Sequence, residues 1–155
     1  MRAKILILGS VCLLIFVSTF AQEKSKEPTP LQKYVARANQ TPLTFKVPKE
    51  KEEEVWGRIQ SFIAKHSSMK IQIATDYVIE TYNPLKIELS DPEWPGANFG
   101  YEAIKTPMGD EVEFEVKCFS GEPGGWYKWC ADKNAHYLAY YALTGEVEEE
   151  VVWRK

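Results

Sequence analysis

FGYEAIKTPMGDEVEFEVKCFSG, residues 99–121, has the pattern of a β-hairpin. Two runs of alternating apolar and polar residues flank residues 107–110, where Pro, Gly and Asp are typical of a turn. Successive side chains of a strand point to opposite faces, so one face of the second run is apolar and the other is charged. The apolar face consists of Val112, Phe114, Val116 and Cys118. Cys118 is therefore expected to leave the sheet on its core side.

A strand and a long helix are predicted ahead of this hairpin. Residues 43–47 (LTFKV) have the composition of a short strand, and Pro48 suits the first turn of a helix, where a missing N–H costs nothing. Glutamates at the start of this helix and Lys65 at its end match the charge of the helix dipole. Its core face combines Val55, Trp56, Ile59, Phe62, Ile63 and His66.

Residues 69–81 alternate with a period of two, which predicts either one long bent strand or two strands that turn near residues 75 and 76. Residues 86–100 (KIELSDPEWPGANFG) are expected to form a surface loop that carries Trp94. Residues 132–144 favour a helix that begins at Asp132 or Asn134 and ends at Gly145, with a strand as the alternative. Residues 146–155 suggest an edge strand.

The sequence predicts a single α+β domain over residues 43–155. A curved antiparallel sheet packs against the long N-terminal helix, and a second helix lies near the C-terminus. About 134 residues after a removed leader suit one hydrophobic core. Residues 22–42 hold three prolines and little apolar periodicity, so they are expected to form an exposed lead or linker. The order of elements is broadly similar to that of helix-grip and cystatin-like domains, a likeness that implies no activity.

The first 21 residues have the pattern of a signal peptide: a basic start, an apolar run, and small residues before the expected cleavage after Ala21. We expect a secreted or periplasmic protein without a membrane span after cleavage; the alternative is an uncleaved N-terminal membrane anchor. Cleavage removes two positive charges and no acidic residue, which changes the formal charge from −3 to −5. This balance argues against a nucleic-acid partner, and the acidic runs suit solubility.

The two cysteines outside the leader, Cys118 and Cys130, are expected to form a disulfide, as in most exported chains with two cysteines. Their spacing does not fit a Cys-x-x-Cys redox pair. An alternative is a cysteine nucleophile with His136 as base, oriented by Asp132 or Asn134. The order Cys, His, polar residue is similar to that of cell-wall cysteine peptidases, but Cys118 ends a strand, whereas their cysteine opens a helix.

No metal site or cofactor is predicted. Asp132 and His136 would lie one turn apart on a helix, and His66 is the other imidazole, but neither HExxH nor paired CxxC occurs. The glycines of residues 120–126 (SGEPGGW) do not have the spacing of a phosphate-binding loop. They are better interpreted as turn residues.

Aromatic residues in two loops are the predicted ligand-binding residues: Trp94, Trp126, Tyr127 and Trp129. Rigid exposed rings can stack on sugars or anchor a protein; the alternative is that they cover the disulfide as a small satellite core. We therefore expect an exported, non-enzymatic binding domain for an envelope or extracellular protein or glycan. This hypothesis of a binding domain requires that at least two of the three tryptophans be exposed on one patch. The alternatives are a cysteine-type hydrolase and a structural subunit that uses the charged sheet edge.

Overall fold

The computed structural model describes residues 27–84, 98–121 and 125–152. Its elements, in chain order, are α1 (Pro30–Gln40), β1 (Thr44–Pro48), the 3₁₀ turn η1 (Lys49–Lys51), α2 (Glu52–His66), β2 (Ile71–Ala74), β3 (Val78–Thr81), β4 (Phe99–Met108), β5 (Glu111–Ser120) and α3 (Gly125–Thr144). The expected α+β class is confirmed. In the described part of the chain, no helix combines the length and apolar character that a membrane crossing requires.

The five strands form one antiparallel sheet in the order β1-β5-β4-β3-β2. The predicted hairpin is confirmed: β4 and β5 pair along their whole length, and Gly109 adopts the left-handed conformation (φ 73°) that the turn requires. β2 and β3 are two strands that turn at residues 75–77, so the second of the two alternatives for residues 69–81 is correct. The hairpin thus provides the central strand, β4, and β5 lies between β4 and the edge strand β1.

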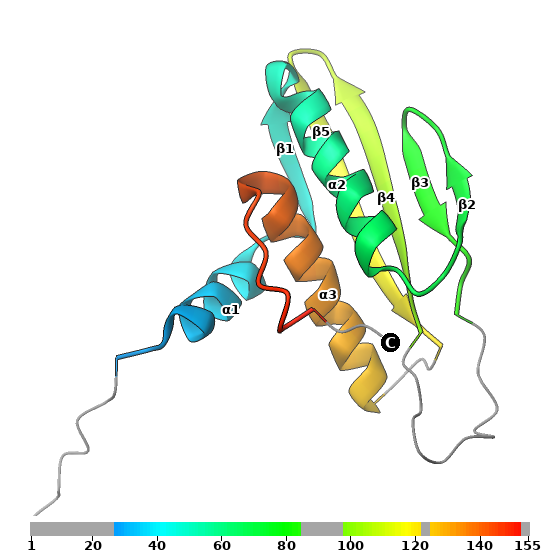
Figure 1. Cartoon of the computed structure of the whole chain (residues 1–155). Coiled ribbons are helices and arrows are strands. Elements are labelled where there is room, and N and C mark those ends of the chain that lie inside the picture. Colours follow the sequence, from blue (N-terminus) through cyan, green and yellow to red (C-terminus); the bar gives the residue numbers. More distant parts are fainter. Residues whose placement is uncertain (1–26, 85–97, 122–124, 153–155) are drawn as a thin grey trace, which may run out of the picture.

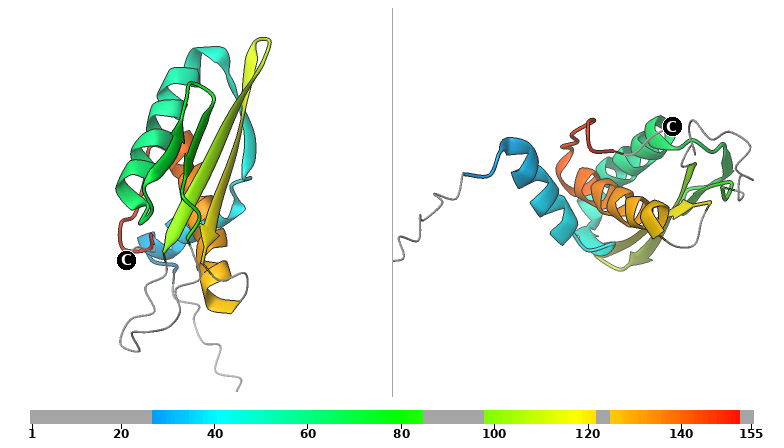
Figure 2. Two further views of the ribbon diagram at one scale, coloured as in Figure 1. Left: turned by 90° about the vertical axis from the view of Figure 1, so that its right-hand side faces the viewer. Right: turned by 90° about the horizontal axis from the view of Figure 1, so that it is seen from below.

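Helices cover one face of this sheet, as Figures 1 and 2 show. α2 and α3 lie against the strands, and α1 packs on the side of α3 that is turned away from α2. The core between the layers includes all the apolar residues predicted for α2 and for the inner face of β5; Cys118 packs against this core and is only partly buried. The core is therefore one two-layer unit.

An ion pair closes the end of the core at the start of α2. Lys105 of β4 points into the core and is only 8% exposed, and its ammonium lies 2.7 Å from a carboxylate oxygen of Glu52. The same ammonium lies 5.4 Å from the ring centroids of both Trp56 and Tyr77. The nearby carboxylate and the two aromatic faces compensate the charge for lost hydration.

The prediction of an exposed linker at residues 22–42 is wrong for the second half of this segment, which forms α1. Thr29 caps this helix: its hydroxyl accepts from the Gln32 backbone N–H (3.2 Å), and the Gln32 side chain accepts from the Thr29 N–H (2.9 Å). Pro30 occupies the first turn, where it is well tolerated. Only Tyr34 and Ala38 of this helix are buried, so its apolar stripe is too narrow to stand out in the sequence.

α3 is a helix, as favoured, but it begins at Gly125 rather than near Asp132 or Asn134. Three of the predicted loop residues, Trp126, Tyr127 and Trp129, therefore lie on its first turns. The helix ends as predicted, with Gly145 in the left-handed conformation (φ 76°) and its N–H bonded to the Tyr141 carbonyl.

The edge strand expected at residues 146–155 is also wrong as far as the structure describes that segment. Residues 145–152 form an irregular segment and a turn, with no strand. Val152 is buried, and Val147 and Val151 pack against the core. The three valines thus pack against the core without pairing with a strand. Residues 153–155 lie outside the described residues.

Candidate functional site

Two exposed tryptophans stack on each other at the start of α3. Gly125 begins the helix in the left-handed conformation (φ 67°), and Trp126 and Trp129 follow three residues apart, on one side of the helix. Their ring centroids are 4.8 Å apart with an interplanar angle of 25°. Trp126 is 58% exposed and Trp129 is 45% exposed, the highest values among the described tryptophans. We call this pair the tryptophan patch.

Charged side chains of the first turns of α3 lie near the tryptophan patch. The ammonium of Lys133 lies over the Trp129 ring, 5.6 Å from its centroid. Lys128 and Asp132 form an ion pair (2.7 Å) between consecutive turns. The patch is thus an apolar surface with a polar border, which is the composition of many protein interaction sites.

The structure brings together two of the four aromatic residues predicted to bind a ligand. Trp126 and Trp129 are adjacent, so two exposed tryptophan rings do lie on one patch. Tyr127 is half-buried and lies between them in sequence, about 100° around the helix. Trp94 lies outside the described residues.

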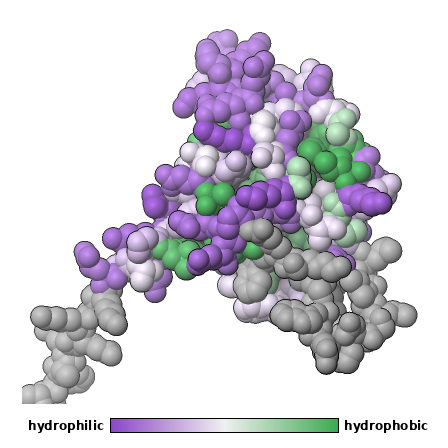
Figure 3. Space-filling view, viewed as in Figure 1, coloured by the Kyte–Doolittle hydropathy of each residue, from purple (hydrophilic) through white to green (hydrophobic). Residues whose placement is uncertain are grey.

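A second exposed apolar surface lies on the β2–β3 hairpin, visible as the green area at the right of Figure 3. Ile71, Ile73 and Tyr77 are 44%, 38% and 54% exposed, on and beside the edge strand β2. The side chains of this surface do not form a stacked pair, and it carries none of the residues predicted to bind a ligand.

Cys118 and Cys130 are both free thiols in the structure, which therefore does not contain the expected disulfide. The Cys118 thiol lies on the inner face of the sheet near Tyr101 and Asn134, and the Cys130 side chain is buried on α3, one turn before Asn134. Because a helix fixes the direction of Cys130, this residue cannot fold back as it would in a loop. Pairing of the two cysteines stays a prediction for the oxidised protein.

The environment of the cysteines does not favour a nucleophile. Burial raises the pKa of both thiols above the ordinary value, and for Cys118 the nearby Tyr101 hydroxyl offsets only part of that rise. A catalytic cysteine needs the opposite shift, because the thiolate is the reactive form. His136 Nδ1 lies 2.8 Å from the carbonyl oxygen of Thr41, which directs the ring toward the junction of α1 and β1. Cys130 and His136 are six residues apart on α3, and this spacing places them on different sides of the helix.

Tyr101 places a hydroxyl in the core beside Cys118 and Asn134, without a well-formed hydrogen bond to any described residue. The residue is fully buried, and its hydroxyl lies beside Cys118 and Asn134. No group in the described ranges meets both the distance and the angle of a hydrogen bond with it. Burial, followed by the proximity of Cys118, raises the Tyr101 pKa well above its usual value.

The residues that were considered and rejected as metal ligands, Asp132, His136 and His66, have other contacts in the structure. Within the described residues, no three His, Cys, Asp or Glu side chains lie together as a metal site would need. Asp132 pairs with Lys128, as described above. His66 is buried at the end of α2, with its ring 4.3 Å from that of Phe62 and its Nε2 3.8 Å from a carboxylate oxygen of Glu149.

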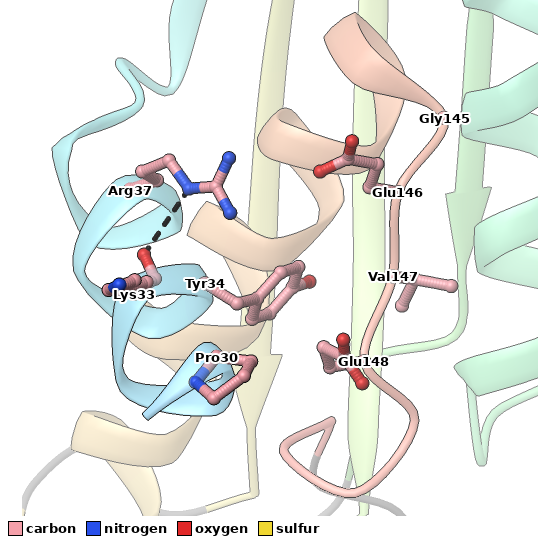
Figure 4. Close-up of a pocket in the computed structure, with 8 residues that line it drawn as sticks. All are labelled: Pro30, Lys33, Tyr34, Arg37, Gly145, Glu146, Val147 and Glu148. Carbon is pink, nitrogen blue, oxygen red and sulfur yellow. Dashed lines mark hydrogen bonds between the residues drawn. The ribbon is translucent and has the colours of Figure 1, made fainter. Parts of the chain in front are cut away.

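A groove that the sequence did not predict lies between α1 and the segment after α3. It has a volume of about 550 Å³ (Figure 4), and its lining consists of Pro30, Lys33, Tyr34, Arg37, Gly145, Glu146, Val147 and Glu148. Half of these residues belong to the region expected to be a linker. The capping pattern Thr29-Pro30-x-Gln32, followed by Tyr34 and Ala38 one turn apart, is the signal that could have indicated the helix.

Comparison of the chain with protein-family models, with curated proteins and with solved structures found no match, so the candidate sites rest on the geometry of this chain alone.

Proposed function

We propose that this protein is an exported, non-catalytic interaction module that binds a protein partner through the tryptophan patch. The observation that carries the proposal is the exposure of two large stacked rings, Trp126 and Trp129, at the first turns of a well-packed helix. Aromatic side chains exposed to water on a rigid element provide much apolar area with little entropy to lose on binding. The pattern of the first 21 residues supports export.

The exposed area is large enough to contribute most of a binding energy. Covering about 100 Å² of an indole at 25 cal/mol per Å² stabilises a complex by about 2.5 kcal/mol per ring. This is the size of a hot-spot contribution in protein interfaces, where tryptophan is enriched. The polar border formed by Lys128, Asp132 and Lys133 would surround the contact.

The stacked geometry favours a protein partner over a glycan. A sugar ring binds an aromatic side chain across an open ring face. Here Trp126 and Trp129 each turn one ring face toward the other, and Lys133 lies over the Trp129 ring, so the pair offers a sugar fewer open faces than two separate tryptophans would. Two rings stacked in this way form a ridge, and an apolar pocket on a protein surface can receive such a ridge.

The test compares three forms of the protein: the wild type, the double variant Trp126→Ala/Trp129→Ala, and the control Leu143→Ala. Leu143 is also exposed (38%) and lies in the last turn of the same helix. Each form is immobilised and incubated with envelope and extracellular fractions of the source organism. Retained proteins are quantified by mass spectrometry, and a protein that only the double variant fails to retain is purified for titration.

For that protein we expect each single tryptophan variant to weaken binding by about 2 kcal/mol, roughly 30-fold, and the control to bind as the wild type does. Thermal unfolding of all variants should stay close to that of the wild type, because the rings are exposed. Retention of the same proteins by all three forms would refute the proposal. Glycan-array binding that depends on both tryptophans would instead assign the patch to a sugar.

A further inference from the structure

The groove between α1 and residues 145–148 has oppositely charged sides. Arg37 extends from α1, and Glu146 points toward it from the segment after α3, as Figure 4 shows. Glu148 lies further along the same segment, beside Tyr34. One wall is therefore cationic and the other is anionic, although the two segments are more than 100 residues apart in the sequence.

No ion pair joins the two walls in the part of the chain that the structure describes. The contacts of the Arg37 guanidinium are a hydrogen bond from Nε to the Lys33 carbonyl (3.4 Å) and a position 6.0 Å from the Tyr140 ring centroid. Glu146 accepts a hydrogen bond from the Tyr140 hydroxyl through one oxygen (2.9 Å). Within the same described ranges, the Glu148 carboxylate has no hydrogen bond or ion pair. The groove thus keeps charged groups of both signs available to a ligand.

The floor of the groove is rigid and aromatic. Tyr34 is only 3% exposed, and its ring packs on Tyr137 (5.9 Å between centroids) and edge-on against Tyr140 (5.3 Å). The Tyr34 hydroxyl is neutral at physiological pH, as tyrosine hydroxyls ordinarily are, and burial raises its pKa further, to about 12. A neutral, well-packed floor between two charged walls is a preorganised site.

We infer that this groove binds a short peptide with free ends, whose carboxylate lies against Arg37 and whose ammonium lies against Glu146 and Glu148. A ligand with one charge would be attracted to one wall and repelled by the other, whereas a dipolar ligand satisfies both. The volume of about 550 Å³ is within the range of small-molecule sites and suits two or three residues. This site is separate from the tryptophan patch and does not depend on the function proposed for it.

The probe is trialanine with free ends, compared with its N-acetylated and its C-amidated forms. Each is titrated into ¹⁵N-labelled protein up to 10 mM, and the amide signal of Gly145, which lines the groove, reports binding. Because exposed charge pairs contribute at most about 1 kcal/mol, we expect each blocked end to weaken binding by roughly threefold to fivefold.

Charge reversal provides the sharper test. Arg37→Glu and Glu148→Lys should each weaken binding of free trialanine by roughly fivefold to tenfold, because attraction becomes repulsion. The double variant exchanges the signs of the two positions, and a dipolar ligand can bind it in the reverse direction, so affinity should recover. A control reversal on the opposite face of the sheet, Lys46→Glu, should leave binding unchanged. Circular dichroism of each variant confirms that the exposed substitutions leave the fold intact.

Three results would each overturn the inference: no shift of the Gly145 signal at 10 mM trialanine, equal binding of free and blocked peptides, or no recovery in the double variant. The tryptophan variants should bind trialanine as the wild type does. Failure of the peptide titration would therefore leave the tryptophan patch untouched, and failure of the partner experiment would leave the groove untouched.

Discussion

Removal of the Tyr101 hydroxyl is expected to stabilise this protein, although the residue lies at the centre of the core. Tyr101 is fully buried between the sheet and the helices, and its hydroxyl lies beside Cys118 and Asn134 but forms no well-formed hydrogen bond within the described residues. Tyr101→Phe deletes one oxygen atom and keeps the ring that packs edge-on against Phe62 (5.9 Å between centroids). The substitution therefore tests the cost of the buried hydroxyl almost in isolation.

The expected gain follows from two opposing terms. A buried polar group without a partner costs about 1–3 kcal/mol, which the phenylalanine variant would recover. The void left by one atom costs less than a methyl-sized cavity, about 1 kcal/mol at most. The difference is a stabilisation of about 1 kcal/mol, equivalent to a rise in Tm of roughly 3–5 °C for a domain of this size.

Tyr140→Phe is the matched control. The Tyr140 hydroxyl donates a 2.9 Å hydrogen bond to the carboxylate of Glu146, so its removal should destabilise the protein by about 1 kcal/mol. The two substitutions are chemically identical, both lie on the core side of the fold, and they are expected to have opposite signs.

Urea unfolding followed by circular dichroism measures both effects, and an unchanged m value would show that the unfolded state is unaffected. Destabilisation by Tyr101→Phe of 1 kcal/mol or more would refute the reasoning. It would mean that the hydroxyl is bonded in the folded protein, to the neighbouring Cys118 or Asn134 or to a buried water.

Three further predictions concern the backbone, the thiols and pH. Gly57→Ala should raise stability by about 0.5–1 kcal/mol, because Gly57 is exposed on α2 and no atom lies within 4 Å of the new Cβ. Gly100→Ala should lower stability by about 1–3 kcal/mol, because its Cβ would lie 2.8 Å from the Tyr82 carbonyl oxygen. Urea midpoints distinguish the two outcomes, and equal effects of the two substitutions would contradict them. Because the pKa of both thiols is raised in the folded protein, Cys118 and Cys130 should react far more slowly with a thiol reagent at pH 8 in the reduced, folded protein than after unfolding, and equal rates would contradict this expectation. Burial raises the pKa of both thiols in the folded protein, so the unfolded chain loses the thiol protons at a lower pH than the folded protein does. The thiol contribution to stability should therefore be constant up to about pH 8.5 and fall as the pH rises above that value. A constant urea midpoint up to pH 10 would disprove this linkage.

Local patterns were sufficient for the hairpin and for α2. In β5, an apolar residue at every second position indicated the buried face, and Gly109 marked the turn. In α2, the buried residues recur at helical spacing between acidic and basic ends. Both elements bury one face and expose the other, and this arrangement gives each of them a periodicity that a sequence reveals.

The other two helices were harder to predict because their burial does not follow a single stripe. α3 lies between α1, α2 and the sheet, so its buried residues point to several sides and its pattern also resembled a strand. α1 buries only Tyr34 and Ala38, so it resembled a linker. In each case the neighbouring elements, which a local pattern does not contain, determine which residues are covered.

The sequence by itself determined the fold class, the central hairpin, the core face of α2 and the aromatic residues from which the tryptophan patch is built. Only the tertiary structure decided that Trp126 and Trp129 lie on one helical surface and stack, because that depended on where α3 begins. Tertiary structure alone also formed the groove, whose walls come from the two ends of the described chain. The physical reason is that periodicity reports how each segment divides its residues between core and solvent, whereas a site depends on which segments become neighbours when the core is packed.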